Sequence, residues 1–374
     1  MKKANFEQKL ICILFCGFLA VMAVLLFALP KADFSELEKR ELASSPVLNW
    51  ESLTSGQFGE DAETFMADHM PGRNFFVGLN AYFELLTGRQ ITKDYYLSGD
   101  RLFTAPVEWN QAQIDLNLKY INKFAAAQNQ PVDLILVPST GFIIGDTGFS
   151  KPYLDGEYID AIYGLTDENI RCLDLVSLFK AEADPASLYY RTDHHWTSYG
   201  AWLATSGYMG SLGRNFPAKE AFSVETAQDF RGSAYSSAGL WLVKGEPIEM
   251  WSTGAAIKVE ASTAPDVVHD GVFYTEKLQE ADKYTVFLGG NQPLVRLKNE
   301  NNAGKGKILV IRDSYANCMG PFLAESYAEV VMMDLRYFKT TAASKLIEQE
   351  GFDEILICYS IGNFMTDKNF TFLR

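Results

Sequence analysis

The chain is poor in the residues that metal and redox centres use. It has four histidines and five cysteines among 374 residues, with no CxxC pair and no HExxH motif. A structural zinc site, a thioredoxin-like redox centre and a zinc protease of the HExxH type are therefore disfavoured. The same scarcity of cysteine excludes a disulfide-dense secreted scaffold. We expect a protein that needs neither a cofactor nor a metal ion.

Basic residues are also in deficit. Lys and Arg together number 33 against 47 Asp and Glu, which gives a formal net charge of −14. A protein that binds nucleic acid needs a basic surface, so we expect no nucleic-acid partner. The P-loop, the GxGxxG motif and the GxSxG elbow are absent as well. With 48% hydrophobic residues, the composition is that of a globular protein.

One long hydrophobic run stands near the N-terminus. Residues 10–29 contain no charged side chain, and that length spans a bilayer as a helix. Lys2, Lys3 and Lys9 precede the run. The positive-inside rule then predicts a cytoplasmic tail at 1–9, a transmembrane anchor at 10–29 and an extracytoplasmic remainder. A cleaved signal peptide is the alternative, although its apolar region is usually only about 7–15 residues long.

The sequence changes character at about residue 90. Residues 30–90 are polar and then amphipathic at helical spacing, with a break at Pro71-Gly72, which predicts a stalk with two helices. Residues 91–374 alternate between short apolar runs and helical patterns, which predicts an α/β domain with a parallel sheet. We expect an irregular β-rich insertion at about 216–300, with a hairpin at 240–251.

The elements of this domain can be placed from the same patterns. The predicted strands are a hairpin at 91–103 and the runs 132–138, 170–175, 307–312, 328–333 and 353–359. The predicted helices are 111–128, 176–183, 197–213 and 341–350.

Two motifs at the ends of these elements indicate chemistry. Ser314 lies where a predicted strand turns into a helix, and ligands bind outside the carboxyl ends of parallel strands. The tetrad Asp-His-His-Trp at 193–196 lies just before another helix. A serine nucleophile needs a base, and the base needs an orienting carboxylate. In an extended segment residues two apart point the same way, so Asp193 would orient His195 while His194 points away. We therefore predict a triad of Asp193, His195 and Ser314.

The same residues also have simpler interpretations. Asp193 and the two adjacent histidines could hold a metal ion. Alternatively, Asp193 could cap a helix while His195 is a satisfied buried ring, and Ser314 could serve only as a helix cap.

The tetrad at 193–196 resembles the signature of the DHHW protein family. Further blocks of the chain look like that family's in the same order: 36–48, 229–239, 282–293, 311–323 and 334–338. The family is similar to the alginate O-acetylation proteins, a branch of the SGNH hydrolases with permuted motifs. The resemblance implies an SGNH-hydrolase-like three-layer fold, with Asp193 as triad acid, His195 as base and Ser314 as nucleophile. Arg312 stands where SGNH proteins usually have glycine.

The resemblance also implies an asparagine in the oxyanion hole. Asn363 and Asn291 both follow a glycine, and we prefer Asn363 because a predicted strand ends just before it. Asn363 could equally be a turn residue. Arg336, which follows another strand, is a further candidate for contacting substrate, although a structural ion pair is its favoured interpretation.

The function that the resemblance implies is O-acetylation of a surface or secreted polysaccharide. The enzyme would be a single-pass, membrane-anchored serine O-acetyltransferase whose C-terminal domain lies outside the cytoplasm. Its expected partners are the polysaccharide acceptor and a multi-pass membrane O-acyltransferase that brings acetyl groups across the bilayer. A carbohydrate acetylesterase with the same triad is the alternative, as is a non-catalytic polysaccharide-binding or assembly factor.

Overall fold

The structure of the protein is a computed structural model. It describes residues 6–35, 40–89, 94–146 and 148–374. Parts of the predicted tail at 1–9, of the block at 36–48 and of the hairpin at 91–103 lie outside the described residues.

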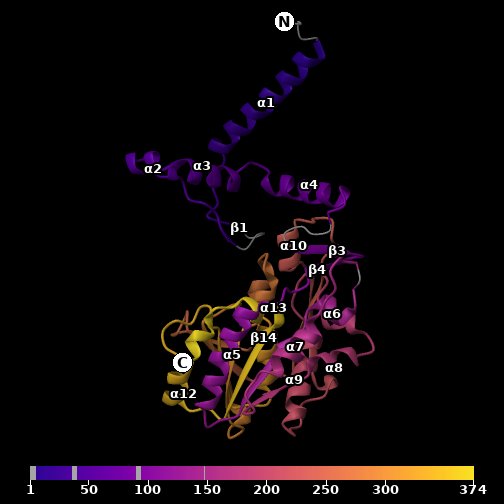
Figure 1. The fold of residues 1–374 in the computed structure, drawn as a ribbon, viewed down its shortest axis with the longest axis vertical. Coiled ribbons are helices and arrows are strands. Elements are labelled where there is room, and N and C mark those ends of the chain that lie inside the picture. Colours follow the sequence, from indigo (N-terminus) through magenta and orange to yellow (C-terminus); the bar gives the residue numbers. More distant parts are fainter. Residues whose placement is uncertain (1–5, 36–39, 90–93, 147) are drawn as a thin grey trace. The chain divides into compact units, whose positions relative to one another are not determined.

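Contacts between residues divide the chain into two compact units. The first comprises Met1–Arg89 together with Ser236–Trp241, and the second comprises Gln90–Tyr235 together with Leu242–Arg374. Each unit has its own arrangement of secondary structure (Figure 1).

The first unit begins with the apolar helix α1 (Phe6–Ala28), none of whose residues is buried. Within the described residues it is the one helix long and apolar enough to cross a membrane. A signal sequence near the N-terminus would have the same length and composition. The apolar run predicted from the sequence therefore does form a helix, and by these criteria it is a candidate membrane span.

The described residues 40–89 of this unit form three more helices, where the sequence predicts two. Asn49 caps the first of them through a capping box, in which its Oδ1 accepts from Ser52 N at 2.8 Å. Gly56, at φ 85°, ends that helix and separates it from the next. The break at Pro71-Gly72 separates the last two, as predicted. The remaining elements are β1 (Phe34–Ser35), β2 (Arg40–Glu41), α2 (Trp50–Ser55), α3 (Gln57–Asp68) and α4 (Arg73–Leu86).

The second unit is built on an eight-stranded sheet in the order β10-β9-β11-β13-β12-β14-β5-β6. The five strands from β13 to β6 are parallel, whereas β11, β9 and β10 pair antiparallel at one edge. The strands are β5 (Val132–Val137), β6 (Ile170–Cys172), β9 (Ile257–Ala261), β10 (Val268–Asp270), β11 (Leu294–Asn299), β12 (Lys307–Arg312), β13 (Glu329–Met333) and β14 (Glu354–Ser360). Two small antiparallel pairs lie apart from this sheet: β3 (Tyr95–Ser98) with β4 (Arg101–Thr104), and β7 (Ser223–Phe230) with β8 (Glu246–Ser252).

Helices cover both faces of the sheet, because successive side chains of each strand point to opposite faces. In β12, Ile308 and Val310 join one hydrophobic cluster while Leu309 and Ile311 join the other. The first cluster includes residues of α8 (Leu175–Lys180), α9 (Ser198–Ser211) and α11 (Ala316–Ala324). The second includes residues of α5 (Gln111–Ala126), α7 (Asp155–Tyr163), α12 (Ala343–Glu350) and α13 (Ile361–Thr366). The predicted three-layer α/β fold is confirmed, and the predicted parallel sheet is extended at one edge by three antiparallel strands.

The remaining elements are shorter helical pieces, of which α10 is divided between the two units at Tyr235 and Ser236. They are α6 (Thr140–Ile144), α10 (Ser233–Ala238) and the 3₁₀ turns Pro185–Leu188, Lys219–Ala221, Thr275–Gln279, Lys283–Val286, Glu300–Asn302 and Asn369–Leu373.

The order in which the strands are added to the sheet reverses at β12. The chain leaves β12 through α11, on one face, to reach β13. It then returns through α12, on the other face, to β14 on the opposite side of β12. Such a reversal opens a crevice outside the carboxyl ends of the strands, where ligands bind in open α/β sheets. Ser314, two residues after β12, lies at this point.

The segment 216–300 is more closely tied to the sheet than its irregular pattern indicates. Its strands β9, β10 and β11 extend the central sheet. The hairpin expected at 240–251 does not form, because the partner of β8 is β7, which comes before α10 in the chain. The alternation of residues in β8 reveals a strand but not which distant segment pairs with it.

Candidate active site

The tetrad lies on a bent loop that is held by hydrogen bonds at both ends. Glu246 accepts hydrogen bonds from the backbone N–H groups of Arg191 and Thr192, at 2.8 and 2.7 Å. Burial raises the pKa of Glu246, while these hydrogen bonds oppose the rise. At the other end, Trp196 is fully buried and donates from Nε1 to the Tyr315 carbonyl oxygen at 2.9 Å. The loop therefore has a fixed position relative to the residue that follows Ser314.

The three residues predicted as a triad form one hydrogen-bonded chain. The His195 Nδ1 lies 2.5 Å from the Asp193 Oδ1, and the His195 Nε2 lies 2.8 Å from the Ser314 Oγ. The same Oδ1 of Asp193 accepts the backbone N–H of His195 at 2.8 Å. Asp193 is 1% exposed, His195 5% and Ser314 8%. In this arrangement the imidazole can take the hydroxyl proton while the carboxylate fixes its tautomer.

Two buried tyrosines pack against the ring of His195. The His195 ring stacks on Tyr284 with ring centroids 4.0 Å apart and an angle of 8° between the planes. The ring of Tyr315 lies on another side at 4.9 Å. Burial raises the pKa of both phenols well above the ordinary value, so both remain protonated donors at neutral pH. Tyr315 uses its hydroxyl to donate to the carbonyl oxygen of His194.

Asp313 organises the turn that carries Ser314. Its Oδ1 accepts the backbone N–H of Tyr315 at 3.0 Å. Its Oδ2 accepts from the Ser360 N–H at 2.8 Å, the Ser360 hydroxyl at 2.8 Å and the Asn363 Nδ2 at 2.7 Å. The fully buried carboxylate thus links the ends of β12 and β14. It shapes the turn that carries Ser314, whose hydroxyl lies 2.8 Å from the His195 Nε2 and does not cap the helix that follows.

His194 does not point away from His195, contrary to the prediction. The two rings lie 3.9 Å apart at 35°, and the His194 side chain is 26% exposed against 7% for His195. The prediction assumed an extended segment, but residues 191–195 form a series of bends. Period-two alternation therefore does not apply to this loop.

Asp193, His194 and His195 are also of the residue types that bind metal ions. One ligand atom each from Asp193, His194 and His195 lies within 4.8 Å of the others. These atoms already have partners: the Asp193 Oδ1 is used by His195, and the His194 Nδ1 lies 2.6 Å from the Ser233 Oγ. The His195 Nε2 is used by Ser314. A metal ion would have to displace several of these hydrogen bonds.

Asn363 and Asn291, the two candidates for the oxyanion hole, have different hydrogen-bond partners. Asn363 donates to Asp313 as described, so part of its amide is committed to the turn. Asn291 accepts at Oδ1 from Asn317 Nδ2 at 3.0 Å, which turns its own NH₂ group the other way. Asn317 lies one helical turn after Ser314 and donates its backbone N–H to the Ser314 carbonyl oxygen at 3.2 Å.

The two arginines near this edge are held by one carboxylate. Arg336 binds Asp334 through two hydrogen bonds, Nε to Oδ1 at 2.9 Å and Nη2 to Oδ2 at 2.6 Å. Arg312, fully buried, lies 3.4 Å from the same carboxylate and donates to the Gln292 carbonyl oxygen at 3.2 Å. The favoured interpretation of Arg336 as an ion-pair partner agrees with this arrangement.

Sequence reasoning missed three residues that contact Asp193 or the loop. Ser233 donates to the Asp193 Oδ2 from its backbone N–H at 2.6 Å and from its hydroxyl at 3.0 Å. Gly232 lies so close that an added Cβ would come within 2.2 Å of the Asp193 side chain. Glu246 was missed because it lies more than fifty residues from Arg191 and Thr192 in the chain, and only folding brings it beside them. The signal for the first two was the block at 229–239, which contains both.

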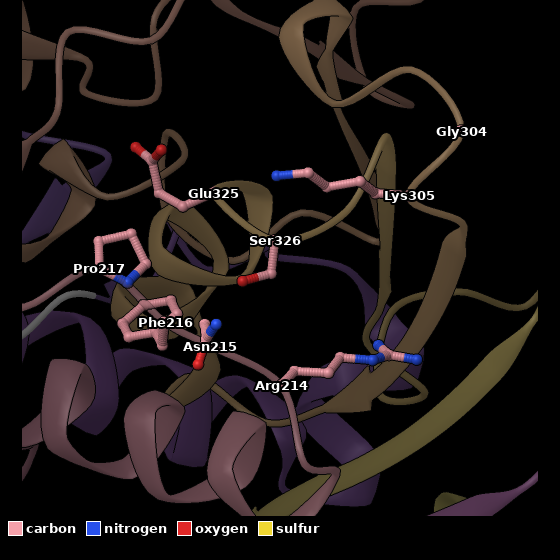
Figure 2. A pocket seen from close by; sticks show the side chains of 8 residues that line it. All are labelled: Arg214, Asn215, Phe216, Pro217, Gly304, Lys305, Glu325 and Ser326. Carbon is pink, nitrogen blue, oxygen red and sulfur yellow. The ribbon is translucent and has the colours of Figure 1, made fainter.

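A cavity of about 670 Å³ lies at the other end of the sheet. Figure 2 shows Arg214, Phe216 and Lys305 among the side chains around it. Lys305 precedes the first residue of β12, whereas Ser314 follows the last. This cavity is therefore separated from the triad by the length of a strand and does not serve it.

Residues 157–333 match the family model described as DHHW protein. No curated protein sequence matches the chain. Among solved structures, a DHHW family protein from Eubacterium siraeum is similar, with 19% identity and a TM-score of 0.64 over 76% of this chain and 97% of that one.

Two further structures are similar to the chain. PatB1 of Bacillus cereus, solved with a sulfonyl adduct, has 19% identity and a TM-score of 0.64 over 75% of this chain and 98% of its own. The O-acetyltransferase domain of Pseudomonas putida AlgJ is more distant, at 12% identity and a TM-score of 0.45 over 73% and 92%. The closer two show a shared fold. The resemblance to the DHHW protein family, predicted from the tetrad and its accompanying blocks, is confirmed over residues 157–333.

Proposed function

We propose that this chain is a membrane-anchored serine O-acetyltransferase that acts outside the cytoplasm on a surface or secreted polysaccharide. Ser314 is the nucleophile, His195 the general base and Asp193 the residue that orients the base. The observation that carries this proposal is the continuous chain from Asp193 Oδ1 through both nitrogens of His195 to Ser314 Oγ.

The reaction proceeds in two halves on the same serine. In the first, the His195 Nε2 takes the Ser314 hydroxyl proton while Oγ bonds to the acetyl carbon of a donor. The donor's leaving group departs with the proton from His195. In the second, a sugar hydroxyl gives its proton to His195 and bonds to the acetyl carbon, and the Ser314 Oγ leaves and recovers that proton. The enzyme is regenerated unchanged.

The negative charge on the acetyl oxygen needs donors at the nucleophile turn. Among the residues that the structure describes, none accepts a hydrogen bond from the Ser314 N–H. The N-terminus of α11, just after Ser314, adds its partial positive charge. We favour Asn291 over Asn363 as the side-chain donor. Asn317 donates to the Asn291 carbonyl oxygen, and the Asn291 NH₂ group makes no hydrogen bond to the residues that the structure describes, whereas the Asn363 amide bonds to Asp313.

The location and partners belong to the same proposal. Residues 10–29 anchor the chain, 1–9 form a cytoplasmic tail, 30–90 a stalk, and 91–374 the catalytic domain outside. The apolar helix α1 supports an anchor. An acetyl donor on the far side of a bilayer requires a carrier, and a multi-pass membrane O-acyltransferase would supply acetyl groups there.

The nucleophile is tested with a serine-reactive sulfonyl fluoride on the full chain in detergent. PatB1 was solved with a sulfonyl adduct, which makes this class of reagent a suitable choice. The expected result is one adduct on Ser314 that is lost in Ser314→Ala and kept in Ser326→Ala, since Ser326 lines the cavity at the other end of the sheet. Labelling that persists in Ser314→Ala would contradict the proposal.

The base is tested by its kinetics on an activated acetyl ester. Replacing His195 by Ala should lower the rate about 10²–10⁴-fold, the usual contribution of a general base. Comparing acetate release with and without a glycan acceptor separates a transferase from an esterase. If the glycan acceptor does not lower the release of acetate, the result would favour the esterase.

Topology is tested on intact cells that express the chain. Added protease should digest residues 30–374, and the undigested protein should remain with the membrane fraction. Complete protection of that segment would contradict the proposed orientation.

A further inference from the structure

The helix α4 carries an exposed apolar stripe. Phe75 is 56% exposed, Leu79 50%, Phe83 62% and Leu86 86%. Because a helix turns about 100° per residue, these four side chains fall within about 80° of its circumference. Single exposed apolar residues are common on protein surfaces and need no explanation. Four on one helix face form a contiguous patch, of the kind that contacts another protein or a membrane.

The other sides of α4 differ from the stripe. Gly78 and Ala81 are buried, and a Cβ added at Gly78 would lie 2.4 Å from the ring of Trp241. By the same helical spacing, Asn80 and Glu84 fall on a third side. The helix therefore has a packed side, a polar side and an exposed apolar side, which is the pattern of a helix that lies at a boundary between water and an apolar phase.

The stripe borders the apolar helix α1, which belongs to the same compact unit. Phe76, at the edge of the stripe, packs its ring against that of Phe18, with centroids 6.5 Å apart at an angle of 72°. Phe18 lies inside the apolar run 10–29, and none of the residues of α1 is buried. The apolar surfaces of α1 and of the stripe are therefore continuous, and the phase that covers the one can cover the other.

The charge of this segment restricts how a membrane could hold it. Residues 40–89 contain three basic and seven acidic side chains, and α4 itself has only Arg73 and Glu84. Helices that dock on anionic lipid by electrostatic attraction are rich in Lys and Arg on their polar side. An acidic segment is not attracted in this way. Its binding must come from the burial of apolar side chains, for which zwitterionic lipid is sufficient.

We infer that α4 lies in the membrane interface with its stripe buried in the extracytoplasmic lipid leaflet, an inference that rests on the proposed membrane anchor. An amphipathic helix in this position buries its apolar face about 5–10 Å into the boundary between headgroups and acyl chains. The covalent link to α1 keeps α4 beside the bilayer, so even a weak intrinsic affinity for lipid holds it there.

This position changes what the predicted stalk does. A stalk that stands clear of the bilayer holds the domain that it carries away from the membrane. Here the last helix of the stalk returns the chain to the lipid surface at Leu86, shortly before the second unit begins at Gln90. The link to the second unit therefore starts at the bilayer, which suits a reaction carried out at the membrane surface.

The test uses the full chain in phosphatidylcholine vesicles, with one nitroxide label at a time. The label is placed on Leu79→Cys in the stripe, or on Asn80→Cys, its exposed neighbour on the polar side. Oxygen concentrates in hydrocarbon and a nickel chelate stays in water, so their relative effects on the relaxation of the label report its depth. Two native cysteines are buried, and the other three are first replaced by Ala: Cys12, Cys16 and Cys172.

The expected results differ between neighbouring positions. Oxygen should relax the label at Leu79→Cys more than nickel does, and the reverse should hold at Asn80→Cys. Phe83→Cys should behave as Leu79→Cys does, because it lies on the same side of the helix. Adding phosphatidylglycerol should not deepen the label, because the segment is acidic. A label at Val21→Cys in α1 reports whether the anchor is in the bilayer, and thermal unfolding of each labelled chain shows that it is folded.

Two results at Leu79→Cys would overturn the inference while Val21→Cys remains in lipid. If nickel reaches Leu79→Cys as readily as Asn80→Cys, the stripe lies in water. If neither reagent reaches it, protein covers the stripe, from a second copy or from another part of the chain. A chain that leaves the vesicles without α1, or a label at Val21→Cys that lies in water, would instead contradict the proposed anchor and the inference with it.

Discussion

Gly232 lies against the side chain of Asp193 so closely that only a hydrogen atom fits between them. A Cβ at position 232 would come within 2.2 Å of both the Cβ and the Oδ2 of Asp193. Contacts this short do not occur, so any larger residue must move the carboxylate or the loop that carries it. The position of Asp193, the proposed triad acid, thus depends on a glycine 39 residues later in the chain.

Replacing Gly232 by Ala should therefore impair catalysis. A displacement of about 1 Å at catalytic groups can lower a rate about 10²-fold. We expect a fall of that order in the hydrolysis of 4-nitrophenyl acetate. The control is Gly210→Ala, because Gly210 lies in α9 with nothing within 4 Å of its added Cβ. An unchanged rate in Gly232→Ala would show that the carboxylate relaxes without consequence.

Tyr284 should matter for its ring rather than for its hydroxyl. It stacks on His195 at 4.0 Å, whereas its hydroxyl makes only a long hydrogen bond of 3.4 Å to the Ser314 carbonyl oxygen. Tyr284→Phe should keep nearly full activity. Tyr284→Ala leaves a cavity beside the base and should lower the free energy of unfolding by about 3–5 kcal/mol, as for other buried aromatic residues.

The measurement is denaturant unfolding combined with the esterase rate under conditions where both variants are folded. If Phe were as damaging as Ala, the hydroxyl and not the ring would be the important group.

Stability should depend on pH through Glu350. Hydrogen bonds from Arg296, and then from Lys307, lower the pKa of Glu350 from 4.5 to about 2. Because the folded pKa is lowered, this contribution is present above pH 4.5 and is lost as the pH falls toward 2. The carboxylate is partly exposed, so we expect Glu350→Gln to lower the free energy of unfolding at pH 7 by about 0.2–1 kcal/mol.

Urea unfolding of the wild type and of Glu350→Gln across this pH range tests the assignment. The difference should shrink toward pH 2, and Glu348→Gln, exposed on the same helix, should show none. A difference that stays constant with pH would mean that charge is not its cause.

Removing metal ions should leave the activity intact. The ligand atoms of Asp193, His194 and His195 are already occupied by hydrogen bonds to one another, to Ser233 and to Ser314. The purified protein stripped with EDTA should therefore keep its rate on 4-nitrophenyl acetate. Activity that EDTA abolished and zinc restored would reject the serine mechanism and assign the two histidines as ligands.

The sequence predicts the regular part of the fold well, because burial imposes simple patterns on it. The apolar runs at 132–138 and 307–312 become β5 and β12 within one residue, and the helix predicted at 197–213 becomes α9 (Ser198–Ser211). These features depend on neighbours in the chain. The pairing of β7 with β8 does not depend on neighbours in the chain, and the hairpin predicted at 240–251 was accordingly wrong.

The proximity of three residues in the candidate site could be predicted in the same way, while their catalytic roles stay predictions. Asp193, His195 and Ser314 could be named because each lies at the end of an element and has suitable chemistry. The contacts of Asp193 with Gly232 and Ser233 could not, because they join distant parts of the chain. The orientation of His194 was wrong because the loop bends at residues where an extended segment was assumed.

The central claim is that Ser314 carries the acetyl group between donor and acceptor. The most direct measurement is peptide mass spectrometry of the full chain, quenched in acid during turnover of 4-nitrophenyl acetate. We predict one acetyl group on the peptide that contains Ser314, absent in Ser314→Ala and accumulating only slowly in His195→Ala. No acetylated Ser314 peptide at any time during turnover, or an acetyl group that persists on another residue in Ser314→Ala, would contradict the account.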